Sequence, residues 1–593
     1  MRLLVVLSLS RLITGALALY CPPIESPCSC ASSTFEPVNI RCSDSPSLVQ
    51  VLKALSPAKN SLKIDSLIIN SIPITSLPPK AFQGLNIGRL VIRKANLSEI
   101  DPMAFDGQLL ESITEIDLTD NDFQHIPTNG LASLQNLRKL ILAKNHIAYL
   151  KPDSFSLYES REKLSSLDLS ANKIGIIDPA ALAPLKKLEE ITLQNNLLVE
   201  VPMVALRQMK STLKNANLAL NKISYIEPFT FDLPQLESLS LEYNELTDIA
   251  PEALHGLPSL LYFYLTGNKL IRWESELFRS LSNLRNLGIG GTAITHIPFN
   301  AFTHLPRLMR LEMSDGIVST LDNKAFRGAR FLQAIILNNN KLTEIKEDTF
   351  QGLTDLYSLD LSRNGIQEIA DGAFAFLPGL KHLDLSGNDL QSIEPHTFEK
   401  TFLATSDAKM LYLCRNPWNC DEKMDGFRRW LRENIEMVID KPDCTAVCKE
   451  PEWLTNWPIR FPNPPPPADL HSRYLQHRPS ILEPKLSTAQ SASTTTASFW
   501  PPYIFTTPTT ATEMPFPMTP SFARLQRNPA NANKTEEPVD PNQKLPTFTQ
   551  ILFGRLPAAV RNMLHLGTLS RPPSRKEYDY RFANYFSDRN RDV

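Results

Sequence analysis

Serine, histidine and aspartate residues recur at fixed intervals near residue 380 of this 593-residue chain. These residue types can perform nucleophilic catalysis, in which a histidine deprotonates a serine hydroxyl and a carboxylate orients the histidine. On neighbouring strands they would share one surface, which would hold Ser358, Asp360, Ser362, His382, Asp384 and Ser386.

The sequence around these residues argues against catalysis. Leu-Asp-Leu-Ser occurs at 167–170, 359–362 and 383–386, so these residue types are ordinary parts of a repeated strand. A nucleophile also needs a pocket and an oxyanion site, which an open sheet rarely supplies. The chain has no glycine-rich phosphate loop, no H-E-x-x-H and no Gly-x-Ser-x-Gly motif. We therefore predict no enzyme activity, no catalytic residue, no cofactor and no metal site.

The element that carries these residues is an internal repeat of the form L-x-x-L-x-L-x-x-N-x-L, followed by x-x-I-x-x-x-A-F-x-x-L. The five spacings between Leu260 and Leu380 are all 24 residues. The first apolar positions of the fifteen units are Ile64, Ile87, Ile113, Leu137, Leu164, Leu188, Leu213, Leu236, Leu260, Leu284, Leu308, Leu332, Leu356, Leu380 and Ala408.

Each unit predicts a short strand followed by a turn. Leu383 and Leu385 alternate with polar residues, so the strand points its leucines inward and its polar residues outward. One unit cannot bury its apolar groups alone, whereas stacked units form a continuous core. Asn388 can both donate to and accept from backbone groups of adjacent units. The equivalent asparagines are Asn121, Asn145, Asn172, Asn196, Asn221, Asn244, Asn268, Asn340, Asn364 and Asn416.

Four units lack this asparagine and have Ile72, Ala95, Thr292 or Gly316 instead. The first two are near the N-terminal end, where atypical repeats are expected. The other two are in adjacent units, so we expect a change of curvature or a looser hydrogen-bond pattern there.

The eight cysteines lie at the two ends of the repeat array, with none between Cys42 and Cys414. A zinc site is an alternative, but in a secreted chain two disulfide-bonded caps are the better interpretation. The cysteines are Cys21, Cys28, Cys30, Cys42, Cys414, Cys420, Cys444 and Cys448.

The first residues favour secretion. A basic start, an apolar run and small residues predict a signal peptide over residues 1–18, although Arg11 interrupts the run. No later stretch has about eighteen uninterrupted apolar residues, and the C-terminus is charged, so we expect no membrane span and no lipid anchor. The formal net charge of −2 gives no reason to expect nucleic acid as a partner.

These repeats resemble the extracellular leucine-rich-repeat family over roughly residues 61–453. The resemblance implies an α/β solenoid of about 15 units, a horseshoe with a parallel sheet on its concave face. The combination of "YCPPIESPCSC", a repeat-only ectodomain and no receptor tail is similar to secreted repeat-only proteins of nematode epidermal matrix. Those proteins are implicated in organising apical matrix and attaching tissue to cuticle.

The resemblance also implies two cysteine caps. Residues 19–60 look like the N-terminal cap, for which the family implies Cys21–Cys30 and Cys28–Cys42. Repeats then occupy 61–407, and the last repeat and C-terminal cap occupy 408–453, with Phe427, Trp430 and Leu431 on a capping helix. The C-terminal cap departs from the family because Glu422 replaces a cysteine and Cys414 is additional. Its pairing stays open, with Cys420–Cys444 weakly preferred.

Residues 454–593 predict a disordered tail rich in Pro, Ser and Thr, because such sequence buries too little surface to offset chain entropy. O-glycans on this tail and a bare linker are equally good interpretations. The Asn-x-Ser/Thr pattern also predicts N-glycosylation at Asn96 and Asn533.

A candidate binding surface lies in "LLYFYLTGN", where the pattern buries Leu260, Phe263 and Leu265. Outward-facing aromatics, arginine and methionine on adjacent units are typical of protein-binding hot spots, although single exposed apolar residues are common. The predicted binding set is Tyr243, Leu261, Tyr262, Tyr264, Arg285, Met309, Arg310, Glu312 and Ile336, with Asn286, Gly288, Gly290 and Ala334 between them.

We therefore predict a secreted, non-enzymatic scaffold that binds extracellular or matrix proteins. The alternative is an accessory subunit or inhibitor of a secreted enzyme. The sequence leaves the ligand and the oligomeric state undetermined.

Overall fold

The structure, a computed structural model, describes residues 21–31, 38–60, 63–398, 401, 410–434 and 444–464. They all belong to one unit, Met1–Pro467. The predicted signal peptide, Asn533 and the second unit, Ala468–Val593, lie outside the described residues.

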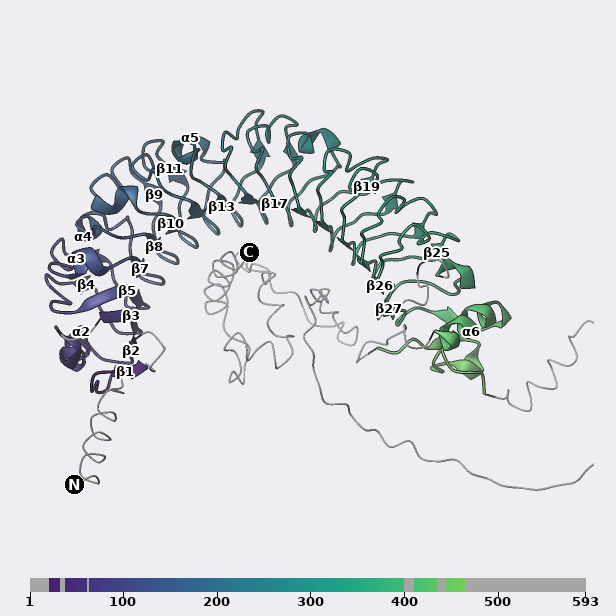
Figure 1. Ribbon diagram of the computed structural model, residues 1–593, viewed down its shortest axis with the longest axis horizontal. Coiled ribbons are helices and arrows are strands. Elements are labelled where there is room, and N and C mark those ends of the chain that lie inside the picture. Colours follow the sequence, from purple (N-terminus) through teal and green to yellow (C-terminus); the bar gives the residue numbers. More distant parts are fainter. Residues whose placement is uncertain are drawn as a thin grey trace, which may run out of the picture. The chain divides into compact units, whose positions relative to one another are not determined.

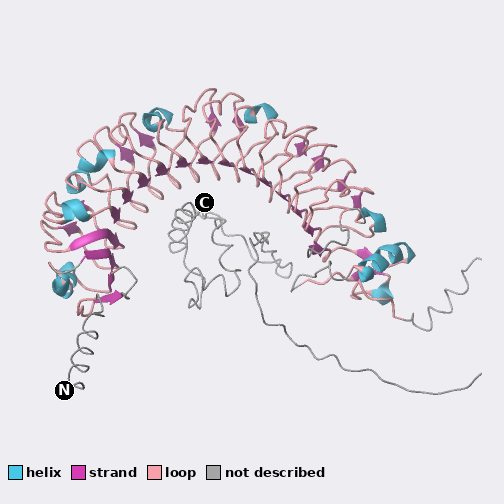
Figure 2. Ribbon diagram, in the orientation of Figure 1, coloured by secondary structure: helices cyan, strands magenta, loops and turns pink. Residues whose placement is uncertain are grey.

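A 17-stranded sheet runs through the first unit and lines the inner side of its curve (Figures 1 and 2). The first two strands, β1 (Cys28–Ala31) and β2 (Asn39–Ser43), pair antiparallel, and every later pairing in this sheet is parallel. One strand comes from each repeat, which confirms the fifteen predicted units. These strands are β3 (Lys63–Asn70), β5 (Asn86–Arg93), β7 (Glu115–Asp117), β8 (Lys139–Ile141), β10 (Ser166–Asp168), β12 (Glu190–Thr192), β13 (Asn215–Asn217), β15 (Ser238–Ser240), β17 (Tyr262–Tyr264), β18 (Asn286–Gly288), β20 (Arg310–Glu312), β22 (Ala334–Ile336), β24 (Ser358–Asp360), β26 (His382–Asp384) and β27 (Met410–Tyr412).

The outer side of the curve carries turns, short helices and two-stranded parallel pairs (Figure 2). The paired strands are β4 (Ser76–Leu77) with β6 (Glu99–Ile100), β9 (Tyr149–Leu150) with β11 (Ile176–Ile177), β14 (Tyr225–Ile226) with β16 (Asp248–Ile249), β19 (His296–Ile297) with β21 (Thr320–Leu321), and β23 (Glu344–Ile345) with β25 (Glu368–Ile369). The described α-helices are α2 (Leu48–Ala54), α3 (Leu109–Ser112), α4 (Thr128–Leu131), α5 (Met203–Leu206) and α6 (Asp425–Glu433). In the part of the chain that the structure describes, no helix is long and apolar enough to span a bilayer.

The core is a stack of identical layers. Leu260, Phe263 and Leu265 are fully buried, as the repeat pattern predicts. The phenylalanines of successive turns form a stack in which ring centroids lie 5.2 to 6.3 Å apart, through Phe302, Phe326, Phe350, Phe374 and Phe398. Removing one of these rings would leave a cavity that neighbours in regular layers fill poorly, at a cost of roughly 3–5 kcal/mol.

The predicted asparagine ladder joins each turn to the one before it. The side-chain amide of Asn388 donates to the carbonyls of Leu361 and Leu385, both at 3.0 Å. Its carbonyl oxygen accepts from the backbone N–H groups of Asn364 and Ile366, at 3.1 and 3.2 Å. One buried side chain thereby satisfies backbone groups that the turn leaves without ladder partners, which confirms the role predicted for this position.

The ladder is weaker where the asparagine is missing. The hydroxyl of Thr292 donates to the carbonyl of Ile289 at 3.3 Å, which replaces one bond of an asparagine. Gly316 has no side chain to contribute, and a Cβ there would lie 2.8 Å from Oδ1 of Asn340. These two turns therefore have fewer side-chain hydrogen bonds than a turn with asparagine, as the sequence predicts.

Disulfides close both ends of the array. The N-terminal pairs are Cys21–Cys30 and Cys28–Cys42, as the family resemblance implies. At the C-terminal end the pairs are Cys414–Cys444 and Cys420–Cys448, so the preference for Cys420–Cys444 is wrong. Together these bonds use all eight cysteines.

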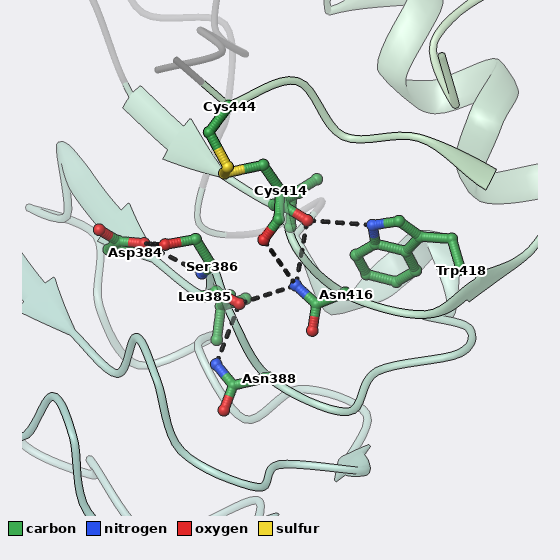
Figure 3. The surroundings of a disulfide bond; sticks show 9 residues. Asp384, Leu385, Ser386, Asn388, Cys414, Asn416, Trp418 and Cys444 are labelled. Carbon is green, nitrogen blue, oxygen red and sulfur yellow. Dashed lines mark hydrogen bonds between the residues drawn. A yellow bond between two sulfur atoms is a disulfide. The ribbon is translucent and has the colours of Figure 1, made fainter. Parts of the chain in front are cut away.

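Strand pairing explains the C-terminal connectivity. The strand β28 (Trp418–Asn419) pairs with β29 (Cys448–Glu450), and the N–H of Cys420 donates to the carbonyl of Glu450 at 2.7 Å. This register places Cys448 opposite Trp418, two residues before its disulfide partner Cys420, and leaves Cys444 for Cys414. Figure 3 shows Cys414 beside Asn416, whose amide bonds the carbonyls of Leu385 and Cys414, so the extra cysteine ties the last turn to the cap.

The capping helix α6 buries Phe427, Trp430 and Leu431, as predicted. It also buries Arg428, whose guanidinium donates to the carbonyls of Ile459 and Phe461 at 2.9 and 2.8 Å and to the side chain of Asn463. These contacts lie beyond Trp453, where the sequence predicts the cap to end. The structured cap therefore reaches at least Asn463, because a buried arginine uses this segment to satisfy its donors.

Candidate functional site

Three tyrosines lie together on the concave side of the central turns. Tyr262 and Tyr264 project from β17, on either side of the buried Phe263, because side chains alternate along a strand. Tyr243 follows β15, has a φ of +52° and is 38% exposed. We call Tyr243, Tyr262 and Tyr264, together with Glu242, the tyrosine patch. The sequence predicts that Tyr262 and Tyr264 are exposed, whereas each is partly buried.

Glycines on the neighbouring turns make room for the rings. A Cβ on Gly267 would lie 2.4 Å from Cδ1 of Tyr243, and a Cβ on Gly288 would lie 3.0 Å from Cδ1 of Tyr264. The rings of Tyr243 and Tyr264 therefore lie against the backbone of the next turn. Gly288 and Gly290, which the sequence places on the outward surface, are buried, and so is Ala334.

Glu242 is the member of the tyrosine patch that the sequence analysis missed. It is partly buried next to Tyr243, and the hydroxyl of Ser240 donates to it at 3.4 Å. Burial, and then the negative charge of Glu312, raise the pKa of Glu242 to about 7. In the sequence, Glu242 is marked only as a carboxylate at a strand end beside an aromatic residue. That pattern is too common to identify a binding residue.

The pKa values of two tyrosines are raised in the same environment. Burial first, and then the charge of Glu242, raise the pKa of both Tyr243 and Tyr264 to about 12. Their hydroxyl groups therefore stay protonated at neutral pH and can donate hydrogen bonds to a ligand.

A charged pair on β20 borders the tyrosine patch. The guanidinium of Arg310 lies 3.3 Å from the carboxylate of Glu312, and both side chains are partly buried. Ile336 extends the surface onto β22 as a partly exposed apolar side chain. The strand order is β17, β18, β20, β22, so these three predicted residues lie on the same sheet as Tyr262 and Tyr264, beyond β18.

The remaining predicted residues form a row at the edge of this surface. Leu261, Arg285 and Met309 each directly precede a strand position, and their backbones are linked, because Arg285 donates to Leu261 and Met309 donates to Arg285. Arg285 is exposed, whereas Leu261 and Met309 are partly buried. All nine residues of the predicted binding set therefore lie within five consecutive turns.

The serine, histidine and aspartate cluster has a different arrangement. Asp384 accepts from both the hydroxyl and the N–H of Ser386, at 2.6 and 3.0 Å, as Figure 3 shows. Burial lowers the pKa of His382. In this local turn the serine donates to the aspartate, whereas a catalytic triad needs a histidine between the two. Ser358, Asp360 and Asp384 are also buried.

The predicted N-glycosylation site at Asn96 lies within the described residues. Asn96 is exposed with a φ of +54°, and the hydroxyl of Ser98 donates to the carbonyl of Thr75. Within the described residues, no group of three or more His, Cys, Asp or Glu side chains is arranged to hold a metal ion.

Comparison with known proteins identifies the repeats. The family model described as leucine rich repeat matches residues 86–147, 135–198, 211–270, 307–366 and 354–401. The described turns, their parallel concave sheet and their asparagine ladder agree with this match. The solenoid has the leucine-rich-repeat fold.

Relatives and solved structures share this domain. Podocan-like protein 1 of Homo sapiens is 28% identical over 292 residues, which cover 44% of this chain and 55% of that protein. Adenylate cyclase of Schizosaccharomyces pombe is 24% identical over 233 residues, which cover 38% of this chain and 13% of that protein. The solved TLR13–ssRNA13 complex superposes with a TM-score of 0.59 at 22% identity, over 70% of this chain and 57% of that chain.

These similarities establish the leucine-rich-repeat fold. The first curated relatives are matched over between 13% and 31% of their own length. Shared repeats of this extent suit a protein-binding solenoid.

Proposed function

We propose that this chain is a secreted, non-enzymatic scaffold whose concave leucine-rich-repeat sheet binds a protein partner through the tyrosine patch and the surrounding predicted binding set. The observation that carries this proposal is the group of three tyrosine rings, each partly open to solvent, on two adjacent turns. Tyrosine supplies a large contact area at low entropic cost and is enriched in binding hot spots.

The rigidity of the support favours the same function. The tyrosine rings lie against glycine backbone and project from a sheet whose strands are paired on both sides. A rigid surface loses little conformational entropy on binding, so more of the contact energy remains as affinity.

An extracellular location is supported by the cysteine chemistry. All eight cysteines form disulfides, and such bonds persist mainly in oxidising compartments. The proposed role is the organisation of apical extracellular matrix or the attachment of tissue to cuticle. Nucleic acid is a poorer partner for the tyrosine patch, because Glu242 and Glu312 would repel phosphate groups.

The test compares proximity labelling by the secreted wild-type chain with labelling by Tyr262→Ser/Tyr264→Ser in the native tissue. We expect the double variant to lose labelling of the main partner at least about tenfold while keeping its melting temperature. Tyr225→Ser is the matched control, because Tyr225 is a 48% exposed tyrosine on the outer strand β14. Equal labelling by all three chains would refute the proposal.

The second candidate is an accessory subunit or inhibitor of a secreted enzyme, which an open concave sheet also permits. The two roles differ in the physical state of the partner. Extraction of the chain with insoluble matrix supports the scaffold, and co-purification with a soluble enzyme supports the accessory role.

A further inference from the structure

Glu242 gives the tyrosine patch a negative charge when it is ionised, and no basic residue is among the described groups that act on it. The groups that act on Glu242 are Glu312, Ser240 and Thr266, and none of them is basic. Arg310, the arginine of β20, is paired with Glu312 at 3.3 Å. A partly buried carboxylate without a counter-charge is costly, so a ligand that brings a positive charge gains free energy there.

The tyrosines beside Glu242 suit the same kind of ligand. The rings of Tyr243 and Tyr264 each lie against a glycine of the next turn, and both side chains remain partly open to solvent. A lysine or arginine head group over a tyrosine ring is attracted by the ring quadrupole, and its methylene groups pack on the ring. Aromatic rings and a carboxylate at one place therefore complement a cationic side chain.

The turn after the tyrosines contributes two glycines and packs closely against its neighbours. The strand β18 contributes Gly288 to this surface, and Gly290 follows it. A Cβ on Gly290 would lie 2.4 Å from the carbonyl oxygen of Ser314, so this turn can carry no side chain there. Neither glycine therefore places a side chain between the tyrosines and the Arg310–Glu312 pair.

We propose that the tyrosine patch receives a lysine or arginine side chain of the partner protein, with its charge beside the carboxylate of Glu242 and its methylene groups on Tyr243 and Tyr264. This inference rests on the proposed function and adds the chemistry of the partner. Its recognition element is one basic side chain at the centre of the contact.

The inference implies binding that strengthens as the pH rises. The titratable and charged groups that face Glu242 are Tyr243, Tyr264, Glu312 and, through Glu312, Arg310. On its other side lies β13, Asn215–Asn217, which has no titratable side chain. With its pKa near 7, Glu242 gains its charge over the neutral range, and a cationic ligand should bind more tightly above that range.

The experiment pans a random peptide library displayed on phage against the full chain, and then measures the affinity of the selected synthetic peptides for the wild type and its variants. We expect peptides with one invariant lysine or arginine, whose replacement by norleucine weakens binding at least about tenfold. Glu242→Gln should weaken binding similarly and remove the difference in affinity between about pH 6 and about pH 8. Glu245→Gln is the matched control, because Glu245 is an exposed residue of the same turn that pairs with Lys269 at 3.5 Å.

The outcomes separate this inference from the proposed function. Peptides that lose binding to Tyr262→Ser/Tyr264→Ser but contain no basic residue, or bind Glu242→Gln as well as wild type, would overturn the inference and leave the proposed function standing. Peptides indifferent to the tyrosine substitutions, or no selected peptide at all, would count against both.

Discussion

The ring of Tyr264 lies against the backbone of Gly288 on the next strand, where a Cβ would be 3.0 Å from its Cδ1 atom and 3.3 Å from the hydroxyl oxygen of Thr266. The glycine thus sets the orientation of the tyrosine. Since Gly288 does not require a left-handed backbone conformation, its role can be tested by adding one methyl group.

Gly288→Ala should displace the Tyr264 ring and weaken partner binding severalfold, because a new Cβ at this distance forces the ring to shift. The free energy of unfolding should fall by about 1–3 kcal/mol. Affinity and urea unfolding are measured together. Gly365→Ala is the control, since its Cβ would have 3.7 Å of clearance, and equal effects of the two substitutions would contradict the assigned role of Gly288.

Glu242→Gln should stabilise the protein at alkaline pH. The folded-state pKa of Glu242 is about 7 against an ordinary value of 4.5, so between these values the folded state binds more protons than the unfolded state. The stability of the wild type should therefore fall as the pH rises through this range. Near pH 8 we expect the free energy of unfolding of the variant to exceed that of the wild type by on the order of 1 kcal/mol. Near pH 4 the two free energies should be equal. Parallel denaturation curves over the whole pH range would contradict the raised pKa.

Asn388→Ala should cost about 2–4 kcal/mol of unfolding free energy, because it removes four hydrogen bonds to buried backbone groups. Thr292→Ala tests the same position of a different turn, where the side chain makes one bond at 3.3 Å, and should cost about 1 kcal/mol. Urea unfolding of both variants distinguishes the two positions. Similar losses would show that the asparagine does not stabilise the stack through these bonds.

The C-terminal disulfides can be mapped directly. Non-reduced digestion and mass spectrometry should yield peptides that join Cys414 to Cys444 and Cys420 to Cys448. The double variant Cys414→Ala/Cys444→Ala should lose about 3–4 kcal/mol, as expected for a loop of this length. A peptide that joins Cys420 to Cys444 would disprove the connectivity.

Arg428→Ala should release the end of the C-terminal cap. Its buried guanidinium holds Ile459, Phe461 and Asn463, so its loss leaves those groups without their donors. We expect faster hydrogen exchange in residues 454–464 and earlier proteolysis there. Arg429→Ala, which removes an exposed arginine from the same helix, should leave exchange unchanged; no difference between the two variants would contradict the role given to Arg428.

The sequence predicts the repeated part of this structure well, because each turn contacts mainly its neighbours. Period and residue type alone place Leu260, Phe263 and Leu265 in the core, and the asparagine at a fixed offset predicts Asn388 in the ladder. The same local rules identify Tyr262 and Tyr264 as outward-facing residues, since side chains alternate along a strand.

Contacts outside the period needed the tertiary structure. The pairing of Cys414 with Cys444 depends on the register of two strands about thirty residues apart, and the partners of Arg428 come from a segment with no repeat pattern. The pKa of Glu242 depends on its burial and on groups of other turns: the charge of Glu312 raises it, and a hydrogen bond with Thr266 lowers it.

The sequence by itself therefore determined the number of turns, the core positions and the surface that faces outward, because a strict period fixes them locally. Only the tertiary structure decided how the cap is connected, how far it extends, and which outward residues form one charged aromatic cluster. Those features arise from distances between side chains on different turns, and a linear pattern does not specify such distances.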